Sequence, residues 1–282
     1  MKIAYIILAH KLPEQLVRLV KKLYTDTSSF LIHVDKKTDN ETYQKMVDPL
    51  CDYKNVGFLK RHVNNWGAFG HVKATLDGIR EALALKLEFD YAILLTGQDY
   101  PIKSNTYIHQ FLEDSGQRSY LEYFSLPNEI WANENGGMDR INFWYLYFLG
   151  RPHKILSRSY LPSHKLPGDF KVFGGRSNWC LTRDCIVYID KYLRRNDRVV
   201  KFFKHAGLPD EIFFQTILLN SHFKSQLVND NLKYVDWSDL LAHPAILLTR
   251  DYEKLIDSTS LFARKFDETV DANILEMIDR VI

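Results

Sequence analysis

Four short segments of the chain carry side chains suited to hold or transform a charged substrate, and the first follows an apolar run from Tyr91 to Leu95. After this run come Gly97, where glycine permits a tight turn, and then the carboxylate of Asp99. A buried parallel strand with this ending places a carboxylate at the carboxyl edge of a sheet, where ligands of open α/β sheets bind. An aspartate that only bonds its own backbone in an Asp-Tyr-Pro turn explains the pattern equally well.

The second segment is Pro209-Asp210-Glu211, directly before an apolar run that predicts a helix through Leu219. Acids at a helix start interact favourably with the helix dipole, so capping is one explanation. A carboxylate fixed ahead of an apolar helix is also well placed to act as a general base. Adjacent residues rarely point at one bond, so the two carboxylates of a glycosidase, roughly 5 to 10 Å apart, are not evident here.

The third segment holds adjacent cations, Arg264 and Lys265, between apolar residues. Cations clamped in this way suit a phosphate group, and the alternative is a surface charge pair. The fourth segment contains Trp66, Gly67 and Gly70, a G-x-x-G spacing that matches neither a dinucleotide-binding fingerprint nor a P-loop. Trp66 is suited to stack on a base or a sugar, or to wedge its loop against the sheet. Dehydrogenase and P-loop kinase functions are therefore disfavoured.

Residues 120–171 combine many aromatic side chains with cations that include Arg151, Lys154 and Arg158. Aromatic faces with interspersed polar groups suit carbohydrate, and basic-plus-aromatic surfaces also suit a membrane interface. A long loop with a solvated, charged face is the alternative. We expect this stretch to face the acceptor of a reaction and a membrane surface.

Strands and helices alternate along the chain that must position these segments. Each predicted strand is apolar throughout, which favours a mainly parallel central sheet flanked by helices. The absence of repeats and of Gly/Ser-rich or Pro-rich linkers predicts one domain, residues 1–282. The predicted strands cover residues 3–8, 29–35, 56–59, 91–95 and 172–182, and the predicted helices cover residues 13–24, 70–87, 184–193 and 208–219.

Composition narrows the class of protein. The chain has 282 residues, 46% hydrophobic and 26% charged, which is typical of a globular protein. Its 37 basic and 35 acidic residues leave a net charge of +2, too balanced to indicate nucleic-acid binding. The three cysteines form no C-x-x-C pair and are expected to be reduced thiols. Without a signal-peptide pattern or an apolar span of roughly 18 to 20 residues, we expect a cytoplasmic protein.

Taken together, these segments resemble glycosyltransferase family 14, the core-2/I-branching N-acetylglucosaminyltransferases and peptide O-xylosyltransferases. The resemblance extends over nearly the whole chain. The segments that carry it are, in order, Ile7-Leu-Ala-His10, His33-Val-Asp35, Trp66-Gly67, Gly97-Gln-Asp-Tyr-Pro-Ile-Lys103, Phe173-Gly-Gly-Arg-Ser177, Pro209-Asp-Glu211, Tyr234-Val-Asp-Trp237 and Leu261-Phe-Ala-Arg-Lys-Phe-Asp267. The Ala-Arg-Lys form is similar to the xylosyltransferase branch.

The resemblance implies a GT-A-like α/β fold, a UDP-sugar donor, inversion at the anomeric carbon and no metal cofactor. Most GT-A enzymes hold a metal ion with Asp-x-Asp, whereas this chain has Gly97-Gln98-Asp99. Lys265 matches the family's phosphate-binding lysine, with Arg264 beside it. A second family arginine has no clear match near His243, and Arg250 is its expected substitute. The implied nucleotide-binding part covers about residues 1–105, and the acceptor-side and catalytic part about residues 106–282.

The resemblance also implies roles for single residues, with Glu211 as the catalytic base. The implied contacts of the nucleotide sugar are Ile7, His10, Asp35, Trp66, Gly67, Asp99, Arg264 and Lys265. The implied contacts of the acceptor are Arg140, Asp210 and Trp237.

The expected function is therefore inverting, metal-independent transfer of N-acetylglucosamine or xylose from a UDP-sugar to a hydroxyl of a glycan or lipid-linked glycan, in surface polysaccharide or glycoconjugate synthesis. Animal relatives carry a membrane anchor and many disulfides, so this chain looks like a bacterial member in the cytoplasm or peripherally at the inner face of the membrane. A glycoside hydrolase and a non-catalytic nucleotide-sugar-binding protein are the alternatives.

Overall fold

Strand β1 (Ile3–Ala9) is paired on both sides in a parallel sheet with the order β4-β1-β2-β3. Its neighbours are β2 (Ser28–Val34) and β4 (Tyr91–Thr96), and β3 (Val56–Phe58) pairs with β2. Side chains of β1, β2 and β4 are almost all buried, because an apolar strand covered on both faces has no solvent-facing side. The prediction of an α/β fold with a mainly parallel sheet and flanking helices is confirmed.

The computed structural model describes residues 1–148, 150–160, 166–167, 170–238 and 244–282. These residues form two compact units whose segments alternate along the chain. Unit 1 comprises Met1–Arg61, Leu87–Gln117 and Leu232–Ile282, and unit 2 comprises His62–Lys86 and Arg118–Asn231. The predicted single domain, with a functional boundary near residue 105, stays a prediction.

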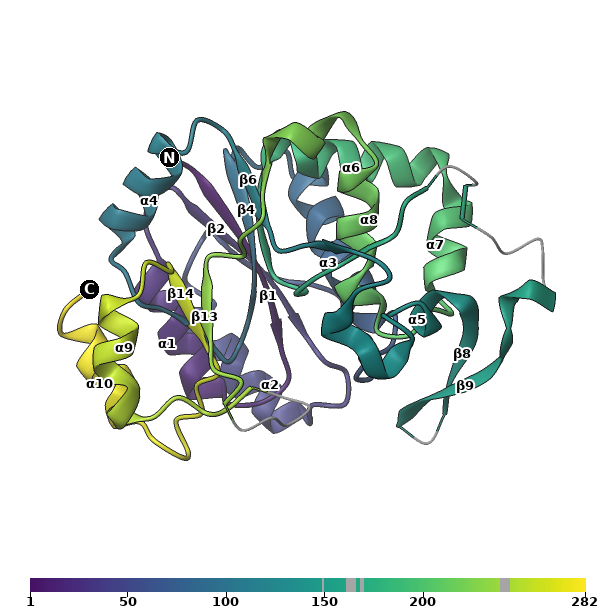
Figure 1. Ribbon diagram of the computed structural model, residues 1–282. Helices are drawn as coiled ribbons and strands as arrows, with labels where there is room; N and C mark the ends of the chain where they lie inside the picture. The colour runs from purple at the N-terminus through teal and green to yellow at the C-terminus, as the bar shows by residue number, and fades with distance from the viewer. Residues whose placement is uncertain (149, 161–165, 168–169, 239–243) are drawn as a thin grey trace. The chain divides into compact units, whose positions relative to one another are not determined.

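The helices of unit 1 follow the apolar spacing of the sequence. Helix α1 (Pro13–Leu23) buries Leu16, Leu19 and Leu23 on one side and exposes Lys21 on the other, and proline at its start has no amide hydrogen to leave unpaired. Near the carboxyl terminus two short helices, α9 and α10, lie side by side (Figure 1). The other helical bounds in unit 1 are α2 (Asn40–Val47), η1 (Asp48–Leu50), α4 (Asn105–Asp114), η7 (Thr249–Asp251), α9 (Tyr252–Asp257) and α10 (Asn273–Asp279).

Unit 1 also contains a small sheet with the order β13-β14-β5. Its strands are β13 (Lys233–Val235), β14 (Phe262–Arg264) and β5 (Asp99–Pro101). One charged residue comes from each strand, and the three meet. The carboxylate of Asp99 accepts hydrogen bonds from Lys233 Nζ at 2.7 Å and from the Thr96 amide at 2.6 Å, and Arg264 Nη1 lies 3.4 Å away.

Both members of the Asp99–Lys233 pair are buried. Burial on its own would raise the pKa of Asp99, but the charges of Lys233 and Arg264 outweigh it and hold that pKa below its ordinary value. Burial lowers the pKa of Lys233 to about 8, against the opposing effect of Asp99. Both groups are therefore charged at neutral pH, and each depends on the other for compensation.

Unit 2 contains the sheet strands β12-β6-β11, which are neighbours in that order, and two antiparallel strand pairs, β8–β9 and β7–β10. Strand β6 pairs in parallel with β12 and antiparallel with β11. The strand bounds are β6 (Ser119–Leu121), β7 (Phe124–Ser125), β8 (Phe143–Phe148), β9 (Arg151–Ser157), β10 (Phe173–Gly174), β11 (Trp179–Thr182) and β12 (Leu227–Val228). The helical bounds are α3 (Gly70–Ala84), η2 (Glu129–Glu134), α5 (Asp139–Asn142), η3 (Arg158–Tyr160), α6 (Arg183–Arg195), α7 (Asp197–Phe203), η5 (Pro209–Glu211), α8 (Phe213–Leu219) and η6 (His222–Gln226).

The helix predicted over residues 208–219 is divided in the structure. Leu208 has a left-handed backbone (φ 43°), and Pro209–Glu211 form one 3₁₀ turn. Ile212 then departs from helical geometry (φ −132°), and α8 begins only at Phe213. Neither Asp210 nor Glu211 caps α8, because each lies before the break and neither side chain makes a capping hydrogen bond.

The charged centre of the small sheet predicts a large asymmetry in stability. Lys233→Met leaves a buried carboxylate that only Arg264 compensates, so we expect a loss of about 3 to 5 kcal/mol in the free energy of unfolding. The double variant Asp99→Asn/Lys233→Met removes both charges and should recover most of this loss. Urea denaturation at pH 7 measures both effects. As the control, Lys45→Met removes an exposed ion pair with Glu41 and should leave the midpoint unchanged. Equal midpoints for Lys233→Met and Lys45→Met would contradict the prediction.

Candidate active site

The twelve predicted site residues fall into two groups, one in each unit. Unit 1 contains Ile7, His10, Asp35, Asp99, Trp237, Arg264 and Lys265, whereas unit 2 contains Trp66, Gly67, Arg140, Asp210 and Glu211.

His10 and Asp35 lie at the carboxyl edge of the parallel sheet of unit 1, the edge at which ligands of open α/β sheets bind. His10 directly follows β1 and is exposed, and its carbonyl accepts a hydrogen bond from the Thr38 hydroxyl. Asp35 directly follows β2, and its amide donates to the carbonyl of Ala9 at 2.9 Å. Ile7 lies earlier in β1 and is fully buried, so its side chain is not accessible to a ligand.

Asp99 does not have the geometry of a ligand-contacting carboxylate. Its side chain is 0% exposed, and both of its oxygens face partners inside unit 1. The predicted direct contact with a nucleotide sugar therefore does not fit this arrangement, because strand β14 covers the position. Asp99 instead holds the guanidinium of Arg264, which also donates to Thr96 Oγ1 at 2.6 Å.

Lys265 is partly exposed, as its neighbours Arg264 and Lys11 are, but unlike them it is in no ion pair within the described ranges. Burial lowers its pKa, and the charges of Lys11 and Arg264 lower it further, against the effect of Asp267. Lys11 was not predicted; its Nζ lies 2.7 Å from a carboxylate oxygen of Asp267. We refer to Lys11, Arg264 and Lys265 as the cation cluster. Such a group of fixed cations suits a polyanion.

A buried amide network fixes the segment that carries the cluster. Gln15 of α1 donates to the carbonyl of Gly97 at 2.9 Å and to that of Phe266 at 3.3 Å. The side-chain amide of Gln98 also donates to the carbonyl of Phe266 at 3.0 Å, and the backbone carbonyl of Gln98 accepts a hydrogen bond from the Phe266 amide. The turn after β4 and the residue after Lys265 are therefore held together. Trp237 follows β13 and is half-buried.

Glu211 is the central acid of the group in unit 2. Its carboxylate accepts a hydrogen bond from Arg140 Nη1 at 2.5 Å, and its side chain stays 28% exposed. The backbone carbonyl of Glu211 accepts the amide of Gly175 at 2.9 Å, which anchors the turn. Burial raises the pKa of Glu211 and the charge of Asp210 raises it further, while Arg140 and Arg176 oppose both effects. A solvent-reachable carboxylate with a raised pKa is suited to general-base chemistry.

Arg140 is buried, and two carboxylates share its guanidinium. Besides Glu211 it binds Glu134 through Nε and, at 3.2 Å, through Nη2. The ring of Trp131 covers the guanidinium, with 3.5 Å between the guanidinium carbon and the ring centroid. A direct acceptor contact by Arg140, as predicted, would have to share a guanidinium already engaged on three sides. Glu134 and Trp131 were missed in the sequence.

The other predicted residues of unit 2 lie on turns. Asp210 Oδ2 lies 3.4 Å from His71 Nδ1, whereas its Oδ1 is buried with no hydrogen-bond partner among the described residues. Trp66 is 59% exposed, as a side chain that stacks on a ligand would be. Gly67 is buried with φ +71°, a backbone conformation that glycine adopts freely, and its carbonyl accepts the hydroxyl of Tyr147.

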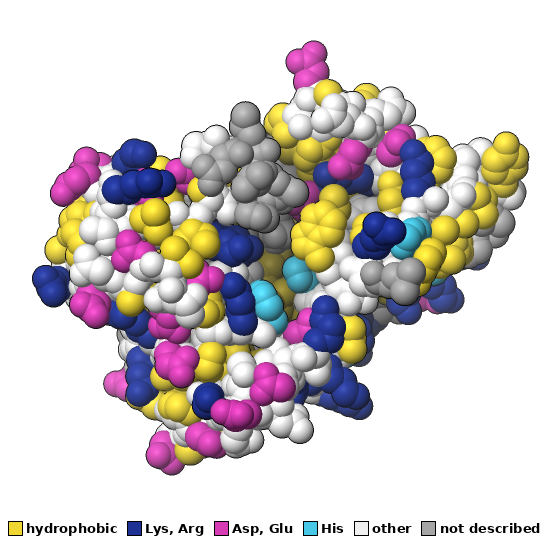
Figure 2. Space-filling view, turned by 90° about the horizontal axis from the view of Figure 1, so that it is seen from below, with side chains coloured by type: hydrophobic (Ala, Val, Ile, Leu, Met, Phe, Trp, Pro, Cys, Tyr) yellow, Lys and Arg dark blue, Asp and Glu magenta, His cyan; other side chains and the backbone are white. Residues whose placement is uncertain are grey.

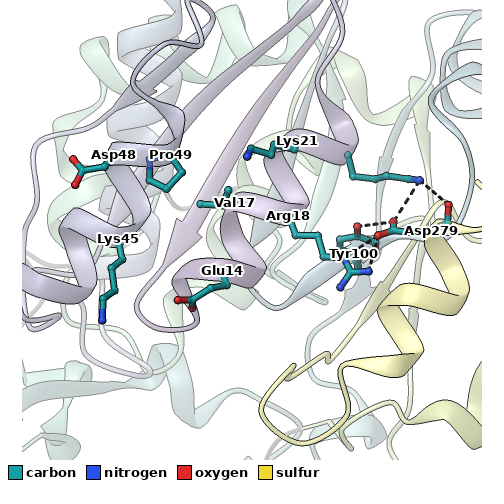
Figure 3. Close-up of a pocket in the computed structure, with 10 residues that line it drawn as sticks. Glu14, Val17, Arg18, Lys21, Lys45, Asp48, Pro49, Tyr100 and Asp279 are labelled. Carbon is teal, nitrogen blue, oxygen red and sulfur yellow. Dashed lines mark hydrogen bonds and ion pairs between the residues drawn. The ribbon is translucent and has the colours of Figure 1, made fainter.

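A groove with a volume of about 890 Å³ lies over α1 in unit 1 (Figure 3). Arg18 and Tyr100 point toward Asp279 at one end, and Lys45 and Asp48 lie at the other. Tyr100 donates to Asp279 at 2.8 Å and Arg18 pairs with it at 2.7 Å. None of the predicted site residues lines this groove, so it is assigned no catalytic role.

Metal and redox features are sparse. In the part of the chain that the structure describes, no three His, Cys, Asp or Glu side chains are grouped as metal ligands.

Cys51, Cys180 and Cys185 are free thiols, as predicted, and the last two are buried. Among the residues described, no helix has both the length and the apolar character needed to cross a membrane. His243, near which the second family arginine was sought, lies outside the described residues.

Curated relatives of similar sequence are xylosyltransferases. Xylosyltransferase 2 of Mus musculus is 29% identical over 301 residues, covering 99% of this chain and 33% of its own length. Xylosyltransferase 1 of Homo sapiens is 25% identical over 300 residues, covering 99% of this chain and 30% of its own length. The chain thus spans about a third of the length of the relatives it matches.

Among solved structures, 4-diphosphocytidyl-2C-methyl-D-erythritol synthase from Anaerococcus prevotii is similar with a TM-score of 0.35 and 10% identity, covering 68% of this chain and 75% of that one. A TM-score of 0.35 is too low to indicate a common function. The family model of the Core-2/I-Branching enzymes, in contrast, matches residues 3–254. Because this match takes in most of the chain, the chain belongs to the Core-2/I-Branching enzyme family, a family of glycosyltransferases.

Proposed function

We propose that this chain is an inverting, metal-independent glycosyltransferase that moves a sugar from a UDP-sugar to a hydroxyl of a glycan acceptor. The observation that carries the proposal is Glu211, an accessible carboxylate with a raised pKa on a rigid turn that caps no helix. The names of the relatives favour xylose as the donor sugar, with N-acetylglucosamine as the alternative that the family name suggests.

Glu211 supplies the base that this reaction needs. A sugar hydroxyl is a poor nucleophile at neutral pH, so its proton must pass to a nearby acceptor as the new bond forms. A carboxylate is a stronger base when its pKa is raised, and burial beside Asp210 raises the pKa of Glu211. Arg140 opposes this effect and favours the ionised form of Glu211, which is the form that accepts the proton.

The cation cluster of unit 1 supplies the charge that the leaving group needs. As the bond to the sugar breaks, negative charge develops on the diphosphate, and fixed cations stabilise that charge without reorganisation. Lys265 and Arg264 are held by the amide network and by Asp99. The carboxylate of Asp99, in the place where GT-A enzymes carry their metal-binding motif, is fully paired inside the unit. These features support catalysis without a metal ion.

Two alternatives make different use of the same residues. A glycosidase needs two carboxylates on one bond, but Asp210 pairs with His71 while its neighbour Glu211 pairs with Arg140. Hydrolysis of an aryl glycoside without a nucleotide would favour this alternative. A non-catalytic protein would bind UDP and show no turnover of any UDP-sugar.

We further propose a peripheral membrane contact through the β8–β9 hairpin. On one face Tyr147 donates its hydroxyl to the carbonyl of Ala206 at 3.1 Å. Because strand residues alternate in direction, Leu146 and Phe148 point the other way, and both are exposed. Hydrophobic side chains gather along this hairpin in Figure 2, which supports contact with a membrane or a lipid-linked acceptor.

One cation predicted for this surface is not on it. Arg158 is buried, donates to the carbonyl of Phe202 at 2.9 Å, and lies 3.9 Å from the Phe202 ring centroid. Its predicted membrane contact is therefore wrong, because burial and the aromatic ring remove it from the surface. Arg151 and Lys154 are exposed. Parts of the stretch 120–171, at residues 149, 161–165 and 168–169, lie outside the described residues.

Glu211→Gln tests the base directly. The amide keeps the shape of the side chain but accepts no proton. The rate of sugar transfer from UDP-xylose or UDP-N-acetylglucosamine to an acceptor, measured as released UDP, should therefore fall at least about a hundredfold. The melting temperature and the affinity for the UDP-sugar should stay close to those of the parent. Full turnover in a destabilised Glu211→Gln protein would assign the residue a structural role and move the base elsewhere, with Asp210 next.

Lys265→Ala tests the leaving-group contact. Loss of a fixed cation should weaken UDP binding and slow turnover, an effect of several kcal/mol on the transition state in comparable sites. Calorimetric titration with UDP measures the first and UDP release the second, with the exposed Lys60→Ala as the matched control. Addition of EDTA to the parent should change neither. Activity that EDTA abolishes and manganese restores would refute metal independence.

The hairpin variant Phe148→Ser/Arg151→Glu tests the membrane contact. Loss of an exposed ring and reversal of a charge should reduce sedimentation with vesicles that contain phosphatidylserine, with no change in melting temperature. Lys191→Glu makes the same charge change at another exposed position of unit 2 and should bind as the parent does. If the parent does not sediment, or if both variants sediment equally, the hairpin is no membrane contact.

A further inference from the structure

Glu134 is the second carboxylate on the guanidinium of Arg140. It ends the 3₁₀ turn η2 and binds Arg140 Nε and Nη2, while Glu211 binds Nη1. The Arg140 side chain is 6% exposed, whereas that of Glu134 is 40% exposed. One buried cation therefore bridges two carboxylates that are distant in sequence. Of the two, Glu211 is the residue proposed to act as the base.

The bridge matters when the charge of Glu211 changes. A carboxylate that accepts a proton becomes neutral, and its attraction to Arg140 falls. A buried guanidinium left without a charged partner is strongly unfavourable, because its desolvation is no longer compensated. With Glu134 in place, Arg140 keeps one charged partner and two hydrogen bonds after Glu211 is protonated.

We propose that Glu134 is a positioning residue that holds Arg140 in place while Glu211 takes up and releases a proton. The inference rests on the proposed role of Glu211 as the base. Glu134 itself touches neither the substrate nor the reacting atoms. It makes protonation of Glu211 easier, because the guanidinium does not lose its last charged partner, and it prevents Arg140 from swinging away from the turn.

The ring of Trp131 completes the clamp, and its own position is tightly constrained. A Cβ atom added at Gly137 or Gly174 would lie 2.4 Å from this ring, so only glycine fits at either position. Phe124 packs against the ring edge-on, with centroids 4.8 Å apart. Trp131 thus covers one face of the Arg140 guanidinium at 3.5 Å and blocks its movement in that direction.

Other charged and titratable groups surround this bridge, and they set the background for any pH dependence. They are Asp210 and Arg176 near Glu211, His71 beside Asp210, and Tyr145 and Asp139 near Arg140. Removal of one carboxylate charge leaves all of these in place. The guanidinium then acts on Glu211 alone, so the pKa of Glu211 falls and the group becomes a weaker base.

Glu134→Gln provides the test, with Glu129→Gln as its control. Glu129 lies in the same turn, is exposed, and has no ion pair within the described ranges. In Glu134→Gln we expect kcat to fall about tenfold with little change in KM, and the acid limb of the kcat profile to move to lower pH. Glu134→Asp should restore part of the loss, because it keeps the charge. Glu129→Gln should match the parent.

A carbon-13 NMR titration of the Glu211 side chain gives a second readout that does not need turnover. A lower pKa of Glu211 in Glu134→Gln than in the parent supports the bridge. An unchanged pKa, or a fall in kcat with an unmoved pH profile, overturns it, since a merely structural role of Glu134 predicts those results. If the parent turns over no UDP-sugar, the proposed function fails, while the titration still decides whether Glu134 controls Glu211.

Discussion

The ion pairs of the buried Asp99 carboxylate are the interactions on which the geometry of the cation cluster in unit 1 depends. It joins β5 to β13 through Lys233 and to β14 through Arg264. Three strands that carry opposite charges can pair at this point only because each charge is compensated within hydrogen-bond reach. The guanidinium of Arg264 is therefore fixed by the core of the unit. Lys265, the next residue after β14, is positioned by the same contacts.

Unit 2 also contains a buried charge that is compensated by groups of opposite sign, but with the signs reversed. There the buried ion is a cation, Arg140, and the groups that compensate it are the carboxylates of Glu134 and Glu211. In both units a buried charge holds a second charged group that remains partly exposed, Arg264 in one and Glu211 in the other. Burial strengthens each contact because the local dielectric is low, and the same burial makes the removal of either partner costly.

The sequence predicted the parallel strands and flanking helices because their apolar periodicity is a local property. It also placed Glu211, Arg264 and Lys265 on segments whose geometry suits charge chemistry. It could not predict the pairings that decide what each charge does, since Lys233 and Asp99 are 134 residues apart and Lys11 and Asp267 are 256 apart. For the same reason the sequence predicted a ligand contact for Asp99 and an exposed position for Arg158. Glu134 lies in a polar turn without any periodic pattern, so nothing in the sequence indicated its contact with Arg140.

In the proposed sugar transfer, charge moves in a direction that the cation cluster of unit 1 and Glu211 of unit 2 each favour. Negative charge develops on a leaving diphosphate, and the cation cluster holds Lys265 among two other cations, whose repulsion an added anion would relieve. A proton arrives at the base, and the raised pKa of Glu211 means that its environment already disfavours the ionised form. Lys11 and Glu134 have parallel effects in this proposal. The charge of Lys11 favours the anionic diphosphate, and the charge of Glu134 favours protonated Glu211.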